Sequence, residues 1–234
     1  MNILKKIWKL RFVFRSLPYS VYFNFHYLPL KQAMKMPILL YKPHFMELKG
    51  KIVIDCNNVR SGMIRMGFRT CGIYPDSGVT WQNIGGIVTF KGYCNIGNDS
   101  YLSFGSKTNV IFGDDFGNTA GLKLVSIRGI IFGKSVRLGW GTLIMDTNFH
   151  PLYDMKRNVY KKASGPIEIG DYNWFGTQCK IMHSVKTPER CIFGMNTIVT
   201  RNCEMKSYCV MGGSPVKILT ENVMRDYEHD QEEL

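Results

Sequence analysis

The chain has 234 residues, 45% of them hydrophobic and 21% charged, enough for one large domain or two small ones with a buried core. This composition excludes the disordered and fibrous classes. It contains no apolar run of about 18 residues or more, so no ordinary membrane-spanning helix is expected. The formal charge of +12 suits an anionic partner, such as nucleic acid, an anionic membrane or a phosphorylated ligand.

Residues 1–45 form a basic, aromatic segment that differs from the rest of the chain. No acidic residue precedes Glu47, whereas the segment carries many cations: Lys5, Lys6, Lys9, Arg11, Arg15, Lys31, Lys35 and Lys42. Apolar residues are mixed with these cations up to Phe14, as in segments that lie at a membrane interface. One long helix through the segment is excluded by its prolines, at Pro18, Pro29, Pro37 and Pro43. We expect it to cap the following domain, to contact an anionic membrane, or both.

A six-residue repeat dominates the remainder. Apolar residues recur at every sixth position, with Thr187 as the exception: Ile169, Phe175, Ile181, Phe193, Val199, Met205 and Met211. The same spacing occurs earlier, at Ile84, Phe90, Ile96 and Leu102, and again at Phe132, Leu138, Ile144 and His150. The register slips between residues 103 and 131. A period of six fits neither an α-helix nor simple strand alternation.

Six residues suit one short strand and one tight turn, with a single apolar side chain pointing inward. Three such units make a triangular coil, and stacked coils pair their strands in parallel. The repeat therefore predicts an all-β solenoid over residues 46–218. A β-sandwich of short strands is the alternative, which the fixed period disfavours. Residues 219–234 form an acidic tail, for which we expect a short C-terminal helix.

A loop insert interrupts the repeat at residues 150–165, HPLYDMKRNVYKKASG. His150 stands at its edge, where an inward apolar residue is due. Loops extruded from a rigid scaffold often carry function. We therefore expect His150 to be catalytic.

Four motifs in this order, TNFHPLYD, IEIGDYNWFGTQCKI, CIFGMNTIVTRN and VMGGSPVKIL, resemble those of the hexapeptide-repeat acyltransferases. The similarity is greatest to the sugar and polysaccharide O-acetyltransferases, which include the maltose and galactoside acetyltransferases, and it covers about residues 84–220. The resemblance implies a left-handed parallel β-helix and a homotrimer with active sites between subunits. It also implies acetyl-CoA as donor, a carbohydrate acceptor, and direct transfer without an acyl-enzyme.

The resemblance assigns the role of general base to His150. An unperturbed imidazole titrates near pH 6.5, so it can take a hydroxyl proton near neutral pH. Asp146, four residues earlier, is a second candidate that would orient the imidazole or help to bind the acceptor. A turn-forming role is its alternative. His183 and Ser184 have no apparent third partner, and we interpret them as structural.

The resemblance also assigns contacts with coenzyme A. Trp174 would form an apolar wall, and Gly176 would let the pantetheine arm approach the backbone. Thr200 and Arg201 would lie beside the phosphates, and Arg201 replaces the family's Lys. The resemblance places Gly213 and Lys217 beside the adenine end of coenzyme A. They belong to a motif in which Ser214 and Val216 replace the family's Asn and Ala.

These features predict an acetyl-CoA-dependent O-acetyltransferase that acts on a sugar hydroxyl in cell-surface polysaccharide or lipid-linked glycan biosynthesis. The alternatives are an N-acyltransferase of an amino sugar, a xenobiotic acetyltransferase, and a non-catalytic β-helix scaffold. Seven cysteines without a CxxC pair predict free thiols in a reducing cytoplasm, where the inner face of the membrane is a further expected location. We expect no metal site and no nucleic-acid partner.

Overall fold

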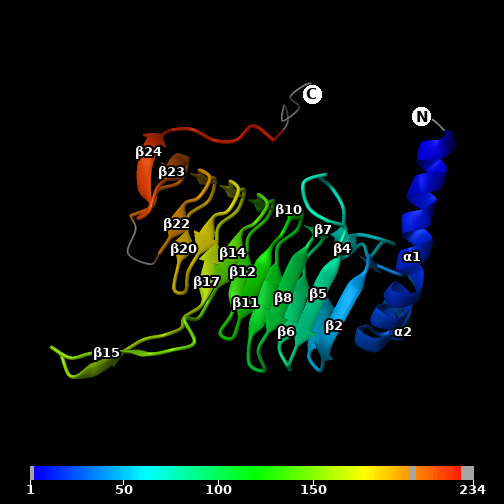
Figure 1. Cartoon of the computed structure of the whole chain (residues 1–234), viewed down its shortest axis with the longest axis horizontal. Helices are drawn as coiled ribbons and strands as arrows, with labels where there is room; N and C mark the ends of the chain where they lie inside the picture. The colour runs from blue at the N-terminus through cyan, green and yellow to red at the C-terminus, as the bar shows by residue number, and fades with distance from the viewer. Residues whose placement is uncertain (1–2, 201–203, 228–234) are drawn as a thin grey trace.

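Short strands and tight turns build a triangular solenoid, in which successive coils add strands to three parallel sheets (Figure 1). The computed structural model describes residues 3–200 and 204–227, with the backbone alone for residues 3–13 and 15. Every neighbouring pair of described strands in the three sheets is parallel, except for β23 and β24. The left-handed parallel β-helix predicted from the sequence is confirmed.

The three sheets and one hairpin take their strands in the following order. Sheet 1 contains β1 (Ile38–Leu40), β4 (Ile64–Phe68), β7 (Cys94–Asn98), β10 (Phe116–Ala120), β13 (Arg137–Leu138), β18 (Trp174–Phe175), β21 (Ile192–Phe193), β23 (Cys209–Gly212) and β24 (Lys217–Glu221). Sheet 2 contains β2 (Pro43–Leu48), β5 (Val79–Asn83), β8 (Ser100–Phe104), β11 (Lys123–Ser126), β14 (Leu143–Met145), β19 (Lys180–Ile181) and β22 (Ile198–Val199). Sheet 3 contains β3 (Lys51–Ile54), β6 (Ile87–Phe90), β9 (Asn109–Phe112), β12 (Ile130–Phe132), β17 (Ile167–Ile169) and β20 (Lys186–Thr187). The hairpin pairs β15 (Leu152–Asp154) with β16 (Val159–Lys161).

Inward side chains stack from coil to coil along the solenoid axis. The rings of Phe90, Phe112 and Phe132 follow one another at centroid distances of 5.2 and 5.3 Å. Phe175 and Phe193 stack at 4.3 Å with an interplanar angle of 1°. Most positions of the six-residue repeat are buried, as predicted. Since each layer buries its aromatic rings only against its neighbours, the stack itself forms the core.

Two repeat positions point outward instead. Ile84 is 45% exposed, because the buried Asn83 side chain occupies the corner and bonds the backbone N–H of Gly86 at 2.8 Å. His150 is exposed because the chain has left the solenoid at that point.

Coil length explains the slip of register in the middle of the chain. Phe175 and Phe193 are paired neighbours 18 residues apart, which is three units of six. Phe90 and Phe112 are paired neighbours 22 residues apart, and Phe112 and Phe132 are 20 apart. The longer coils have longer strands, since β6, β7 and β8 have four or five residues each and β18, β19 and β20 have two. The repeat shifts with strand length while the stacking is kept.

Helix α1 (Ile3–Tyr27) covers the N-terminal end of the solenoid and is followed by the short α2 (Leu30–Ala33) (Figure 1). The prediction that the prolines exclude one helix through residues 1–45 holds, because α1 ends before Pro29. The helix nevertheless passes Pro18, which is exposed. Water on that side can satisfy the carbonyl that loses its N–H partner at a proline.

Side chains of α1 bond the outer edge of β1. Asn24 donates to the Ile38 carbonyl at 2.7 Å and accepts from the Ile38 N–H at 3.2 Å. Ser20 Oγ accepts from the Leu40 N–H at 2.8 Å. Between them, buried Phe23 packs at 5.3 Å from the Trp81 ring. This part of the segment therefore caps the solenoid, which begins at Ile38 rather than at residue 46 because β1 and β2 already pair with β4 and β5.

The other end of sheet 1 is closed by β24, which runs antiparallel to β23. A short helix was predicted after residue 218, but the chain is a strand to Glu221 and a loop to Tyr227. The chain forms a strand instead of a helix because the edge of β23 offers backbone N–H and C=O groups, and β24 forms hydrogen bonds with them. Residues 228–234 lie outside the described residues.

Candidate functional site

The predicted insert is a two-stranded arm that projects from the solenoid (Figure 1). Its base is held where the chain leaves and returns: Thr147 bridges Ser164, and the Asn148 N–H donates to the Ala163 carbonyl at 2.7 Å. Tyr160 on the arm is 73% exposed. The arm therefore has a fixed root and an open surface.

A cavity of about 340 Å³ lies at this root and contains His150. It is lined by Asn148, His150, Leu152, Lys161, Lys162, Ala163, Met182, His183 and Thr200. We call it the His150 cavity. His150 is exposed and its backbone N–H donates to the Asn148 carbonyl at 2.7 Å, which fixes the turn that presents the imidazole. Of the two lining lysines, Lys161 pairs with Asp154 of the arm at 3.6 Å, and the positive charge of Lys162 suits an anionic ligand.

His183 belongs to the same cavity, a placement that the sequence interpretation missed. Its Nε2 lies 3.1 Å from Asn148 Nδ2, and its Nδ1 lies 3.2 Å from Ser184 Oγ. With the Asn148 amide as donor, Nε2 accepts and Nδ1–H donates to Ser184. The sequence offered one indication of this placement, namely that His183 follows β19, one coil after the insert.

Asp146 is fully buried and its carboxylate accepts four hydrogen bonds. The donors are Ser126 Oγ at 2.7 Å and the backbone N–H groups of Ile127, Arg128 and Gly129, each at 2.8 Å. His150 is not among these donors. These hydrogen bonds anchor the adjacent turn at residues 127–129.

Trp174 lies in a different cavity, on the outer face of sheet 1. This Trp174 cavity has a volume of about 380 Å³, and its lining also includes Asn95, Arg137 and Arg225. The Arg225 guanidinium lies 4.6 Å from the Trp174 ring centroid. Arg137 pairs with Asp115 at 2.6 Å. One rim of the cavity thus carries aromatic and cationic groups together.

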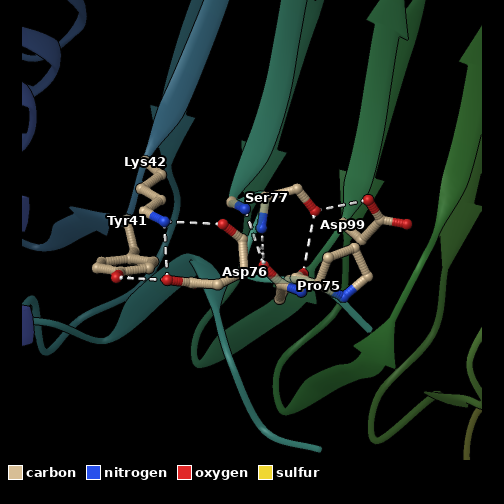
Figure 2. Close-up of polar contacts among 8 residues, drawn as sticks. Tyr41, Lys42, Pro75, Asp76, Ser77 and Asp99 are labelled. Carbon is tan, nitrogen blue, oxygen red and sulfur yellow. Dashed lines mark hydrogen bonds and ion pairs between the residues drawn. The ribbon is translucent and has the colours of Figure 1, made fainter. Parts of the chain in front are cut away.

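A second extruded loop, residues 69–78, contributes Thr70 to the lining of the Trp174 cavity. Thr70 at the rim donates to the Thr119 carbonyl at 2.6 Å. Figure 2 shows the anchor of the loop, where Asp76 accepts from Tyr41 Oη at 3.0 Å and from Lys42 Nζ at 2.8 Å. Burial alone would raise the pKa of the Asp76 carboxyl, but these two hydrogen bonds and the Lys42 charge lower it below its usual value. The loop is therefore held by a charged pair at its root.

The remaining predicted cofactor residues are spread over the C-terminal coils. Thr200 lines the His150 cavity, whereas Arg201 lies outside the described residues. Gly213, at φ +96°, and Lys217 are exposed at the turn that joins β23 to β24. Gly176 is needed by the stack itself, because a Cβ there would come within 2.8 Å of the Met195 backbone nitrogen.

No cluster of three or more potential metal ligands occurs among residues 3–200 and 204–227. The six cysteines of these ranges are free, and four are buried: Cys94, Cys179, Cys191 and Cys209. Within the same ranges, no helix combines the length and apolar character needed to cross a bilayer.

No family model matches the sequence. A protein of Staphylococcus aureus (strain MRSA252), named "Putative acetyltransferase SAR2635", is 33% identical over 73 residues, which are 31% of this chain and 36% of that protein. The chain thus matches about a third of the length of this curated relative.

Among solved structures, the polySia-specific acetyltransferase NeuO matches with a TM-score of 0.58 and 19% identity, over 81% of this chain and 74% of NeuO. A galactoside acetyltransferase in complex with coenzyme A matches with a TM-score of 0.37 and 16% identity, over 91% of this chain and 81% of its own. The similarity to NeuO extends through most of the solenoid and shows the same fold. The predicted resemblance is confirmed at two levels: part of the sequence is similar to a protein named as a putative acetyltransferase, and the fold is shared with NeuO.

Proposed function

We propose that this protein is an acetyl-CoA-dependent O-acetyltransferase that acts on a sugar hydroxyl, in the synthesis of a cell-surface polysaccharide or a lipid-linked glycan. The observation that carries the proposal is the exposed His150 in a cationic cavity at the root of the arm. The match to an acetyltransferase-named relative and the shared fold with NeuO support the reaction class.

In the proposed reaction, the neutral His150 imidazole takes the proton of the acceptor hydroxyl as its oxygen attacks the thioester carbonyl. The tetrahedral intermediate collapses, the C–S bond breaks, and the imidazolium returns the proton to the leaving thiolate. The products are the O-acetyl sugar and free coenzyme A. General-base assistance of this kind contributes about 100- to 10,000-fold in rate. Lys161 and Lys162 line the same cavity, and their charge favours an anionic acceptor there.

The proposal includes a homotrimer, because the candidate residues are divided between two cavities of one chain. His150 and Thr200 line one cavity, and Trp174 lines the other, on sheet 1. A neighbouring copy that brings its Trp174 cavity against the His150 cavity would complete one site. The proposed cofactor contacts are Trp174, Gly176, Thr200, Arg201, Gly213 and Lys217.

The reaction is tested by thiol release from acetyl-CoA with a panel of acceptors that includes neutral glycans, polysialic acid and amino sugars. Turnover with a hydroxyl acceptor that depends on His150 supports the proposal. Turnover with amino sugars alone supports N-acylation instead. Absence of both turnover and coenzyme A binding supports the scaffold alternative.

The shared site is tested by mixing two inactive variants, His150→Ala and Trp174→Ala, during refolding. If the site lies between subunits, some interfaces in the mixture pair an intact His150 with an intact Trp174, and activity returns. A mixture of confirmed hetero-oligomers that stays inactive contradicts the shared site while leaving the reaction class to the thiol-release assay.

A further inference from the structure

We propose that the outer face of α1 and α2 docks on an anionic membrane surface and holds the N-terminal end of the solenoid against it. The inference concerns a surface away from both cavities and does not depend on the proposed reaction.

The outer face of α1 carries exposed apolar side chains in one stripe. Phe14, Leu17, Val21 and Phe25 are 68, 43, 40 and 49% exposed. Their spacings of three and four residues place them on one side of the helix. An adjoining side carries Ser16, Ser20, Phe23 and Asn24, which are buried. The helix is therefore fixed by one face and presents the other to solvent.

The short helix α2 extends the surface with the same combination of groups. Leu30 and Met34 are 65 and 69% exposed, and the neighbouring Lys31 and Lys35 are exposed as well. Aliphatic and aromatic groups beside lysines suit the boundary between acyl chains and headgroups. We call the exposed residues of the two helices the end surface; its large apolar and aromatic members are Phe14, Leu17, Tyr19, Val21, Tyr22, Phe25, Leu30 and Met34.

The charge of this part of the chain selects an anionic partner. Residues 1–45 contain eight Lys and Arg and no Asp or Glu. Each cation near an anionic bilayer contributes roughly 1 kcal/mol, so several of them add substantially to the apolar contact. The structure describes no side chains for residues 3–13 and 15, so the charge of these residues is taken from the sequence.

A lipid surface suits this face better than a second copy of it. Two end surfaces in contact would oppose cations to cations, because Lys31 and Lys35 are exposed on each surface and α1 and α2 contain no acidic residue. A bilayer offers both an apolar layer for Phe14 and Phe25 and an anionic layer for the lysines.

The test is co-sedimentation of the full chain with vesicles. One set contains phosphatidylcholine alone and the other contains phosphatidylcholine and phosphatidylglycerol in equal parts. We expect binding to the second set and little to the first, with a decrease as salt is raised. A variant with Phe14, Leu17, Val21 and Phe25 each changed to Ser should bind more than about tenfold more weakly, since it loses four apolar contacts.

The matched control changes Ile73 and Leu219 to Ser, because these side chains are 63 and 64% exposed but lie far from the end surface in sequence. This control should bind as the parent does, and unchanged thermal unfolding should show that both variants fold. Equal binding of the parent and the four-residue variant overturns the proposal. So does a change of oligomeric mass in that variant without any vesicle binding, which would indicate that the face covers another copy of the chain.

Discussion

Asn148 and His183 are 35 positions apart in sequence, and Asn148 Nδ2 lies 3.1 Å from His183 Nε2 at the root of the arm. The contact connects the segment between β14 and the arm with the coil stacked after it. His150 stands two residues beyond Asn148 and lines the same cavity. The position of the proposed base therefore depends on a hydrogen bond made by a second histidine.

Replacement of His150 by Ala should abolish acetyl transfer while coenzyme A affinity stays nearly intact. The expected loss of kcat is about 100- to 10,000-fold, because the variant lacks the group that takes the hydroxyl proton. Single-turnover transfer and coenzyme A binding by calorimetry measure the two quantities separately.

The companion variant is His183→Gln, which keeps an amide to contact Asn148. We expect a smaller loss than for His150→Ala, because His183 is inferred to position the turn rather than to accept the proton. A larger loss of kcat in His183→Gln than in His150→Ala would indicate that His183 is the base and that His150 has the positioning role.

Asp146→Asn should reduce stability rather than chemistry. The amide nitrogen would face backbone N–H donors that now bond a carboxylate, at a cost of roughly 2–4 kcal/mol in the free energy of unfolding. Denaturant unfolding measures this change, and kcat well below the unfolding transition should change little. Asp114→Asn is the control, because exposed Asp114 accepts one backbone N–H, from Tyr93 at 2.9 Å, and should cost far less. A catalytic Asp146 would instead show a large loss of kcat at unchanged stability.

Gly176→Ala and Gly194→Ala form a matched pair that tests why glycine recurs in the repeat. A Cβ at Gly176 comes within 2.8 Å of the Met195 backbone nitrogen, whereas at Gly194 the nearest atom is the Met211 carbonyl oxygen at 3.6 Å. We expect Gly176→Ala to cost about 1–3 kcal/mol of unfolding free energy, through a shift of the stacked coil, and Gly194→Ala to cost little. Equal stability of the two, with a raised KM for acetyl-CoA in Gly176→Ala, would indicate that the glycine serves the proposed cofactor contact and not the stacking.

Asn24→Ala should loosen the N-terminal cap. Buried Asn24 satisfies both backbone groups of Ile38, so its loss leaves two buried polar groups without a partner, at about 2–4 kcal/mol. His26→Ala is the control on the same helix, because the exposed His26 bonds the Leu48 carbonyl at 2.8 Å and should contribute about 1 kcal/mol or less. Similar losses for both variants would mean that α1 is held by packing and not by its hydrogen bonds to β1.

Cysteine labelling should follow burial. Desolvation, with a smaller contribution from Cys209, raises the pKa of Cys191 to about 12, and desolvation also raises the pKa of Cys94 and of Cys179. Half-buried Cys56 and Cys71 should therefore react with iodoacetamide before these three thiols. Peptide mass spectrometry of the labelled protein resolves the sites, and early labelling of Cys191 would contradict the prediction.

The same thiol predicts a direction for alkaline stability. The folded pKa of Cys191 lies above the ordinary value of 9.0, so only the unfolded state ionises readily between them. This contribution to stability is fully present below about pH 9 and is lost as pH rises toward 12. A Cys191→Ala variant should show a smaller decline of stability in that range.

Much of the solenoid could be predicted from the sequence, because an inward residue such as Phe175 needs a counterpart one coil later and so leaves a fixed period. The period cannot specify corners, which is why Ile84 was expected inside and lies outside. Nor can it show that Pro18 falls on the exposed side of a helix, where its missing N–H is tolerated.

The site was predictable in part. His150 could be located, because it stands where the repeat breaks, and the structure places it in a cavity. His183 could not, because only coil stacking brings it beside Asn148. For Asp146 and Gly176, the same sequence pattern fits a structural role in a turn or coil and a contact with a ligand. Only the residues around them in the folded protein bear on which role applies.

The two closures of sheet 1 also have a consequence for the length of the molecule. Parallel coils have no inherent end, since each exposes an edge on which the next can be built. The side chains of α1 occupy the edge of β1, and the reversed strand β24 occupies that of β23. These two elements cap sheet 1 at both ends, so no further coil can pair with it. A chain deprived of either closure would offer a template on which other molecules could grow into a fibre.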